Sequence, residues 1–276
     1  MNLRQAYEYG RGKLNDAGIE EADLDAWYLL EFVTGIDRAG YYLKMQEEVS
    51  DEQEVRYKKY IDIRASRIPL QHITGVQEFM GLTFCVNEHV LVPRQDTEVL
   101  VESVLQVLQP EMKVLDMCTG SGCILISLMK HCQGLIGVGV DISEEALKVA
   151  SQNCERLSVK LELLRSDLFE KVEGKYDVIV SNPPYIRTEV IRELQEEVRC
   201  HEPFIALDGK EDGLYFYRKI VGNSTAHLND GGKLYFEIGH DQGEDVKMLM
   251  EQAGFKNVQV KKDLAGLDRV VFGKYN

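Results

Sequence analysis

The 276-residue chain lacks several features that would decide its class at once. No apolar run approaches the roughly 20 residues that a membrane-spanning helix needs, and the first residues do not form a signal peptide. The six cysteines include no C-x-x-C pair, so neither a zinc ribbon nor a disulfide framework is indicated. We therefore expect a cytoplasmic protein with reduced cysteines and no membrane contact.

Sequence motifs of zinc-dependent and serine hydrolases and of nucleoside triphosphate binding are also absent. The sequence contains no H-E-x-x-H, no G-x-S-x-G and no P-loop. Its six histidines are scattered without the spacing of metal ligands, so we predict no metal site. The formal net charge of −14 opposes binding to a phosphate backbone, because that affinity comes largely from Lys and Arg. We expect no direct contact with nucleic acid.

What is present is an ordinary globular composition with a helical beginning. Hydrophobic residues make up 44% of the chain and charged residues 28%, which is enough for a sizeable core. Apolar spacing predicts helices over Leu3–Leu14 and Leu24–Phe32. Ser50 and Gln53 form a capping-box pattern for a third helix that ends before Pro69.

The chain length favours a small domain followed by a large one. We assign residues 1–68 to a small helical domain. It holds 10 Lys plus Arg against 14 Asp plus Glu, so it is not a DNA-binding arm. Substrate recognition and a purely structural cover for the catalytic domain are both open readings. Residues 69–92 form a linker with a β-hairpin, in which Ile73–Phe79 and Leu82–Val86 flank a Met-Gly turn.

Residues 93–276 alternate apolar strands with helices. Such alternation predicts an α/β fold with a mostly parallel sheet covered by helices on both faces. One of these helices is Glu144–Leu157, with Ser143 as its N-cap. The expected strands are Met112–Asp116, Leu135–Asp141, Leu161–Arg165, Tyr176–Ser181, Lys233–Ile238 and two terminal runs near Val258 and Val270.

The most informative motif is Asn182-Pro183-Pro184-Tyr185, directly after an apolar strand. Each proline ring fixes its own φ and removes a donor, so the loop presents acceptors. The Asn182 side-chain oxygen and the Pro183 carbonyl would satisfy the two N–H donors of a planar NH2 group. Tyr185 would stack on the plane of that group. Taken alone, a proline pair also serves as a simple strand terminator.

A second motif lies between the first strand of this alternation and its helix. The glycines at 120 and 122 allow a tight turn close to a ligand. Leu125 stands where a dinucleotide-binding fingerprint has a third glycine, which weakens an NAD reading. Asp141 ends the next strand, where a carboxylate accepts from both hydroxyls of a ribose.

A third element, Asp167-Leu168, follows the next strand. Asp167 would accept the adenine amino group and Leu168 would pack against the ring. Singly, Asp141 and Asp167 also read as solvated carboxylates at strand ends. Their succession at the carboxyl ends of neighbouring strands favours a ligand site, because ligands of open α/β sheets bind there.

Together these motifs resemble those of class I S-adenosylmethionine-dependent methyltransferases that act on planar NH2 groups, which have a Rossmann-like seven-stranded sheet. Within that group the chain resembles the HemK/PrmC family, which methylates a glutamine side-chain nitrogen in class 1 peptide chain release factors. The further matching segments are Pro69–Gly75, Val92–Arg94, Thr97-Glu98, Val180–Ile186, Glu202–Leu207 and Asp212–Leu214.

The resemblance implies S-adenosylmethionine as cofactor, S-adenosylhomocysteine as product, and the glutamine of a Gly-Gly-Gln motif as methyl acceptor. It implies catalysis by Asn182, Pro183 and Tyr185, and substrate binding by these three and Pro184. The implied cofactor-binding residues are Cys118, Thr119, Gly120, Ser121, Gly122, Asp141, Asp167, Leu168 and Asn182.

Two departures from the family pattern stand out. Cys118 replaces a glycine found in many relatives, which is tolerable if only its backbone faces the cofactor. Gln95-Asp96 replaces Pro-Glu after Arg94, which leaves the role of Arg94 open.

Other readings stay open at this point. They are a glutamine methyltransferase of a ribosomal protein, an amine methyltransferase of DNA or rRNA, a nucleotide-sensing module without catalysis, and a dehydrogenase-type NAD protein. For the acidic run Glu193–Glu197 we predict a solvated helix face, and the alternative is a helix that contacts the protein substrate. A basic release factor would be attracted electrostatically by an acidic enzyme.

Overall fold

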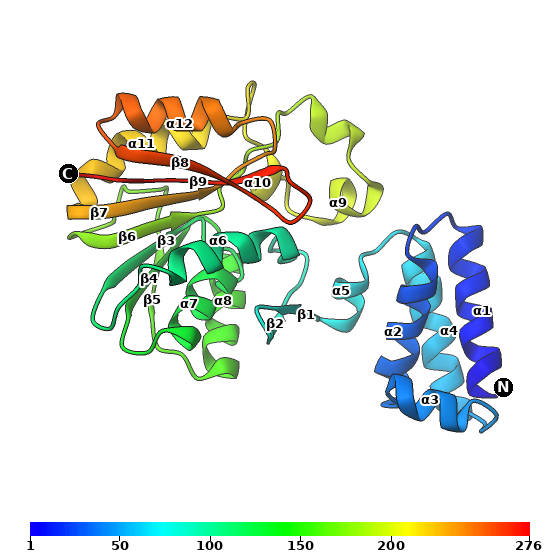
Figure 1. The fold of residues 1–276 in the computed structure, drawn as a ribbon. Coiled ribbons are helices and arrows are strands. Elements are labelled where there is room, and N and C mark those ends of the chain that lie inside the picture. Colours follow the sequence, from blue (N-terminus) through cyan, green and yellow to red (C-terminus); the bar gives the residue numbers. More distant parts are fainter. The chain divides into compact units, whose positions relative to one another are not determined.

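The computed structural model describes residues 1–276 and divides into two compact units (Figure 1). The helical unit comprises Met1–Gly75 together with Gln195–His201. The sheet unit comprises Val76–Leu194 and Glu202–Asn276. The chain therefore leaves the helical unit, returns to it for seven residues after the Asn182 loop, and leaves it again.

The helical unit is built on long helices that pack on one another. Its elements are α1 (Leu3–Asp16), α2 (Ala22–Thr34), α3 (Arg38–Lys44), α4 (Asp51–Ala65), α5 (Leu70–Thr74) and α9 (Glu196–His201). The predicted capping box of Ser50 and Gln53 begins α4, and Asn2 forms a second one at α1. Tyr57 is buried at the centre and donates to the Ala26 carbonyl at 3.1 Å. A Cβ at Gly10 would collide with the Tyr57 hydroxyl, so only glycine lets these helices approach.

A buried ionic cluster holds α9 in the helical unit. Arg64 donates to Asp25 Oδ2 at 2.6 Å and to Glu197 Oε1 at 3.1 Å. Arg67 donates to the same Glu197 oxygen at 3.3 Å. The prediction that Glu193–Glu197 is one solvated helix face is therefore wrong. The run is divided between two short helices, and the Glu197 side chain is only 15% exposed because two guanidinium groups pair with it.

The predicted hairpin is confirmed, with a later start. Strands β1 (Val76–Phe79) and β2 (Leu82–Cys85) pair antiparallel. The turn places Met80 at φ 51° and Gly81 at φ 70°, which is the mirror-image turn that suits the twist of a hairpin. Ile73 and Thr74 lie instead in α5, which is capped by the left-handed Gly75. Helix capping therefore overrides the local β pattern there.

The sheet unit contains a seven-stranded sheet in the order β5-β4-β3-β6-β7-β9-β8. Strands β3 to β7 run parallel, and β9 runs antiparallel to both of its neighbours. The α/β prediction is confirmed. The strands are β3 (Lys113–Met117), β4 (Ile136–Asp141), β5 (Glu162–Arg165), β6 (Tyr176–Ser181), β7 (Leu228–Glu237), β8 (Lys256–Lys262) and β9 (Asp268–Lys274).

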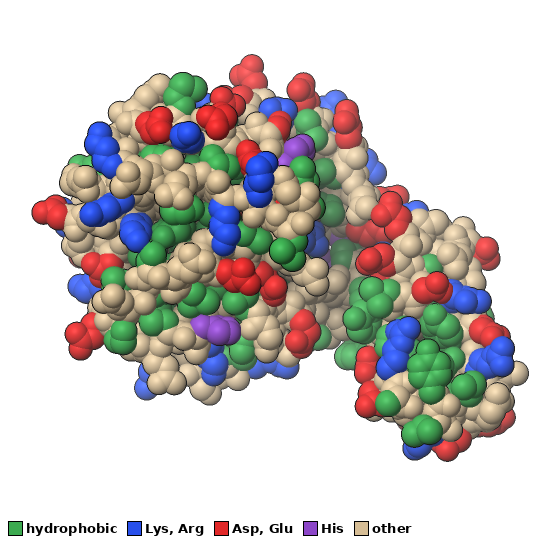
Figure 2. Space-filling model, viewed as in Figure 1, with side chains coloured by type: hydrophobic (Ala, Val, Ile, Leu, Met, Phe, Trp, Pro, Cys, Tyr) green, Lys and Arg blue, Asp and Glu red, His purple; other side chains and the backbone are tan.

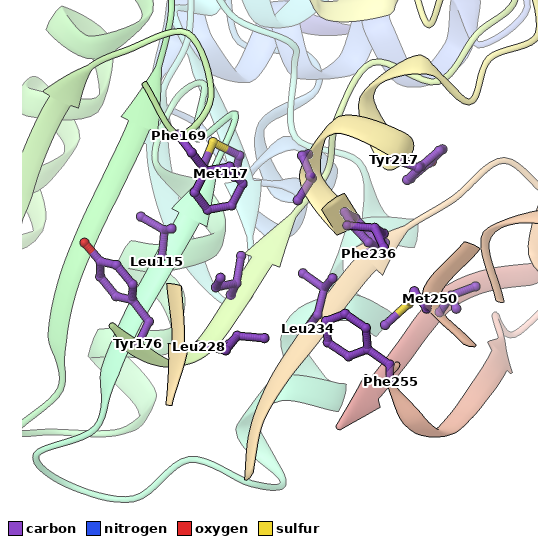
Figure 3. Close-up of a cluster of buried hydrophobic side chains, with 14 of the residues drawn as sticks. Leu115, Met117, Phe169, Tyr176, Tyr217, Leu228, Leu234, Phe236, Met250 and Phe255 are labelled. Carbon is purple, nitrogen blue, oxygen red and sulfur yellow. The ribbon is translucent and has the colours of Figure 1, made fainter. Parts of the chain in front are cut away.

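Helices cover both faces of this sheet (Figure 1). One face packs against α6 (Gln95–Leu105), α7 (Cys123–His131) and α8 (Glu144–Leu157). The other face packs against α11 (Tyr215–His227) and α12 (Gly243–Gln252), around the core cluster drawn in Figure 3. The short helices η1 (Val190–Glu193) and α10 (Phe204–Leu207) follow β6.

Strand order positions the functional loops. The chain winds from β3 to β4 and β5 in one direction and continues with β6 and β7 in the other, so the direction reverses between the adjacent strands β3 and β6. The loops at the carboxyl ends of these strands diverge at such a reversal and leave a crevice for a ligand. No helix of the chain combines the length and apolarity needed to cross a membrane.

Candidate active site

The loop after β3 is a close turn built from left-handed residues. Cys118, Gly120 and Gly122 have φ values of 63°, 55° and 78°. Thr119 lies between them and donates its hydroxyl to Asp116 Oδ2 at 2.6 Å. Gly122 is the N-cap of α7, and its Cα faces Ile126 and Ala150, so it serves helix packing. At Gly120 a Cβ would meet no atom within 4 Å, so this glycine faces open space.

Asp141 ties this loop to the end of β4. Its Oδ2 accepts from the Gly120 amide and its Oδ1 from the Ser143 amide, both at 2.9 Å. Burial raises the pKa of the Asp141 carboxyl, and these backbone donors oppose that rise. Each carboxylate oxygen keeps a further lone pair, so Asp141 can accept from two ligand hydroxyls without giving up its backbone contacts.

The loop after β5 supplies an exposed acid and an apolar side chain. Asp167 is exposed, whereas Leu168 is half-buried and has a left-handed φ of 46°. The Ser166 amide donates to the Asp141 carbonyl at 3.1 Å, which holds this loop against the end of β4. The two strand ends thus form one wall with acceptors and an apolar surface.

One cavity of about 310 Å³ joins these loops. Nine of the predicted site residues line it, and Gly122, Pro183 and Tyr185 do not. The nine lining residues are Cys118, Thr119, Gly120, Ser121, Asp141, Asp167, Leu168, Asn182 and Pro184. The structure therefore brings the cofactor motif and the Asn182 loop to a single site.

The Asn182 loop is anchored from below. Pro183 and Pro184 are buried, and Tyr185 turns its hydroxyl inward to Glu237 Oε1 at 3.4 Å. The Tyr185 carbonyl accepts from Gln242 Nε2 at 3.0 Å. Since the Tyr185 ring does not line the cavity, its predicted stacking on a substrate plane has no direct counterpart in this structure, and its visible contacts support the loop.

Sequence reasoning missed Glu237 and Gln242. Glu237 ends β7, and it is buried with Oε2 lacking a hydrogen-bond partner within the protein. Burial raises the pKa of Glu237 to about 7. The signal for Glu237 was available, because an acid ends an apolar strand here just as Asp141 does in β4. Gln242 gives no such signal, since its partner is a backbone carbonyl 57 residues away in the chain.

Arg94 lies at the cavity and pairs with a buried acid. Its Nη2 donates to Glu202 Oε1 at 2.5 Å, and the Glu202 side chain is 1% exposed. Burial raises the pKa of the Glu202 carboxyl, which Arg94 opposes. Arg94 therefore keeps a structural partner despite the changed residues that follow it.

Comparison with known proteins identifies the family. The description "PrmC N-terminal domain" matches residues 5–75, and "Methyltransferase small domain" matches residues 94–206. The chain is 41% identical over 273 residues to the release factor glutamine methyltransferase of Geobacter sulfurreducens, covering 99% of this chain and 96% of that protein. The chain belongs to the release factor glutamine methyltransferase family.

Other relatives agree with this placement. The release factor glutamine methyltransferase of Clostridium acetobutylicum is 40% identical, with 98% of each chain covered. Among solved structures, a methyltransferase from Pyrococcus furiosus has a TM-score of 0.56 at 19% identity, covering 77% of this chain and 98% of that one. That structure shares the fold with the present family member.

The family's cofactor is S-adenosylmethionine, and the cavity suits it. Gly120 leaves open space beside the loop, and Asp141 keeps acceptor capacity for the ribose hydroxyls. Ile142 and Leu168 line the same wall and offer apolar surface to a base. We expect these residues to hold the cofactor, with Asp167 reaching the adenine amino group.

Proposed function

We propose that this chain transfers the methyl group of S-adenosylmethionine to the side-chain amide nitrogen of the glutamine in the Gly-Gly-Gln motif of class 1 peptide chain release factors. One observation supports this proposal: Asn182 lines the same cavity as Asp141 and the glycine loop. One site therefore combines a cofactor loop with an amide acceptor. We place the reaction in the cytoplasm, where release factors meet the ribosome.

The chemistry asks the protein mainly for positioning. An amide nitrogen is a poor nucleophile, because its lone pair is delocalised into the carbonyl. Asn182 Oδ1 and the Pro183 carbonyl accept the two N–H bonds of the substrate, which raises electron density on the nitrogen and orients it. When bound, S-adenosylmethionine supplies an electrophilic methyl group. No strong base is needed, since the nitrogen releases its proton after it has gained the methyl group.

The surface charge supports a protein substrate over a nucleic acid. Figure 2 shows acidic side chains over both units, with Lys and Arg interspersed among them. The formal net charge is −14. A phosphate backbone would be repelled by this excess, whereas a basic release factor would be attracted.

The direct test incubates the purified chain, labelled S-adenosylmethionine and class 1 release factors, and locates the methyl group by peptide mass spectrometry. Label on the Gly-Gly-Gln glutamine is expected. Ribosomal proteins and rRNA are included as competing acceptors, and label on one of these alone would transfer the assignment to that substrate.

Asn182→Ala tests the role of the loop. We expect cofactor affinity within a few-fold of the original and methyl transfer reduced at least about a hundredfold, the scale of one preorganised hydrogen-bonding group. Titration calorimetry with S-adenosylmethionine measures the first and single-turnover transfer the second. Near-normal turnover by this variant would refute the mechanism.

A further inference from the structure

The sheet unit contains a second cavity, which shares no lining residue with the proposed active site. It has a volume of about 260 Å³ and lies between the end of α6 and the strands β7, β8 and β9. This volume is close to the lower limit of ligand pockets in proteins, so an occupant would be a small molecule.

The charged residues that line this cavity are all lysines. Each of the three strands contributes one of them, and they are Lys233, Lys261 and Lys274. No acidic residue lines the cavity, although the chain contains 46 Asp and Glu. None of the three ammonium groups pairs with a carboxylate, and Lys261 donates to the Ser103 hydroxyl at 3.0 Å. The cavity is therefore a local concentration of positive charge in an acidic protein.

Strand register places two of these lysines against each other. Lys233 lies directly opposite Lys274 in the antiparallel pair of β7 and β9. On the other side of β9, Lys256 also lies directly opposite Lys274. Like charges directly opposite each other destabilise a sheet. An anion bound between them would remove this repulsion.

The types of residue indicate which anion fits. Lysine binds phosphate as a point charge, whereas carboxylates are recognised best by the planar fork of arginine. No arginine lines the cavity. The side-chain amides that line it can donate further hydrogen bonds to phosphate oxygens, and they belong to Gln106, Asn257 and Gln259. A compact anion with several charged oxygens therefore matches the cavity best.

We propose that this cavity binds the diphosphate group of a small phosphorylated ligand, and that Lys233, Lys261 and Lys274 neutralise its charge. The inference does not depend on the proposed function, because the two cavities are separate. It also explains why lysines face one another across β7 and β9 without a carboxylate between them.

Calorimetric titration of the full chain with sodium pyrophosphate tests the proposal. The titration is made at low ionic strength, without divalent cations, and with saturating S-adenosylhomocysteine to occupy the other cavity. We expect one pyrophosphate bound per chain. No binding under these conditions would overturn the proposal.

Lysine variants locate the bound anion. Lys233→Gln and Lys274→Gln should each lower the affinity for pyrophosphate about tenfold, the equivalent of one charge-assisted hydrogen bond. The matched control is Lys160→Gln, which removes the same charge from an exposed position outside the cavity. It should change the affinity by less than about twofold. Equal losses in all three variants would show that only the net charge matters, and would overturn the proposal.

Thermal unfolding separates binding from a structural role of the lysines. Lys274→Gln relieves the repulsion from Lys233, so without pyrophosphate this variant should melt at the same temperature as the original protein or higher. Adding pyrophosphate should raise the melting temperature of the original protein more than that of the variant. A variant that melts lower without pyrophosphate, and gains as much from it as the original, would contradict the proposal.

Two further ligands test the chemical class. Citrate carries its charge on carboxylates and should bind at least about tenfold more weakly than pyrophosphate, because no arginine fork is present. Equal affinity for citrate would refute the assignment to phosphate. Adenosine diphosphate should bind with the same dependence on Lys233 and Lys274, and tighter binding than pyrophosphate would identify the ligand as a nucleotide. Binding of adenosine diphosphate that ignores both lysine variants would count against the site.

Discussion

The two units differ in how completely their buried charged groups are paired. In the helical unit the buried Asp25 and Arg64 pair with each other, and Arg64 also pairs with Glu197. In the sheet unit three buried carboxyl groups each keep one oxygen without a hydrogen-bond partner in the protein. These oxygens are Asp116 Oδ1, Glu202 Oε2 and Glu237 Oε2.

This difference distinguishes buried polar groups that stabilise the fold from buried polar groups that serve a function. Burying a carboxyl without full pairing costs free energy, so a fold keeps such groups where something other than stability requires them. All three lie near the carboxyl ends of the parallel strands or pair with Arg94 at the cavity. The paired cluster of the helical unit instead has a structural role. It holds α9 in that unit, to which the chain returns from the sheet unit.

The largest expected effect comes from breaking the paired cluster. Arg64→Met leaves Asp25 and one contact of Glu197 without their cation, and we expect the helical unit to lose about 3–5 kcal/mol of stability. Trp27 is buried in this unit and is the only tryptophan of the chain. Its fluorescence during urea unfolding therefore reports on the helical unit.

The matched control is the same substitution in an exposed pair. Arg4 pairs with Glu8 at 2.9 Å, with both side chains at least half exposed, so Arg4→Met should leave the free energy of unfolding nearly unchanged. Replacing Asp25 by leucine in the Arg64→Met protein should recover part of the loss, because no uncompensated carboxylate remains in the core. Equal effects of the two methionine variants would contradict the comparison.

The next effect concerns the incompletely paired acids. Burial raises the pKa of Glu237 to about 7, above its unfolded value, so its contribution to stability is fully present below the unfolded pKa and is lost as pH rises through 7. Glu237→Gln does not titrate. The free energy of unfolding of the original protein, relative to this variant, should therefore fall by roughly 2 kcal/mol between pH 5 and pH 8.

Circular dichroism during urea unfolding at several pH values measures this difference, with Trp27 fluorescence to follow the helical unit separately. Asp116 also has a pKa raised to about 7 by burial, but it is present in both proteins and cancels. A difference that stays constant with pH would show that Glu237 does not change its ionisation in this range.

The sequence predicted the sheet and the cofactor loops because both depend on local rules. Apolar strands, glycines at a tight turn and acids at strand ends are visible within a few residues of each other. The same strand-end rule would have flagged Glu237, had it been applied to β7 as it was to Asp141. Glu237 was therefore predictable from the sequence pattern alone.

Other features depend on contacts that no local rule contains. Arg64 and Glu197 are 133 residues apart, so neither the ionic cluster nor the placement of α9 could be read from the chain. The inward turn of the Tyr185 hydroxyl likewise depends on Glu237, 52 residues away. Tertiary partners decide where a polar side chain points, and spacing does not reveal them.

The smallest effect tests strain at the cofactor loop. Cys118 holds a left-handed φ of 63°, which costs a residue with a Cβ about 1–2 kcal/mol. Cys118→Gly removes that cost but loses side-chain packing and adds freedom to the unfolded chain, so we expect a net change below about 1 kcal/mol. Cys118→Val should destabilise the sheet unit by more, because a β-branched residue fits this φ poorly. Urea unfolding measures the stability of both variants.

Titration with S-adenosylmethionine should give an affinity for Cys118→Gly within about twofold of the original if the cofactor contacts only the backbone at this residue. A large loss of affinity in the glycine variant would instead give the Cys118 side chain a part in binding.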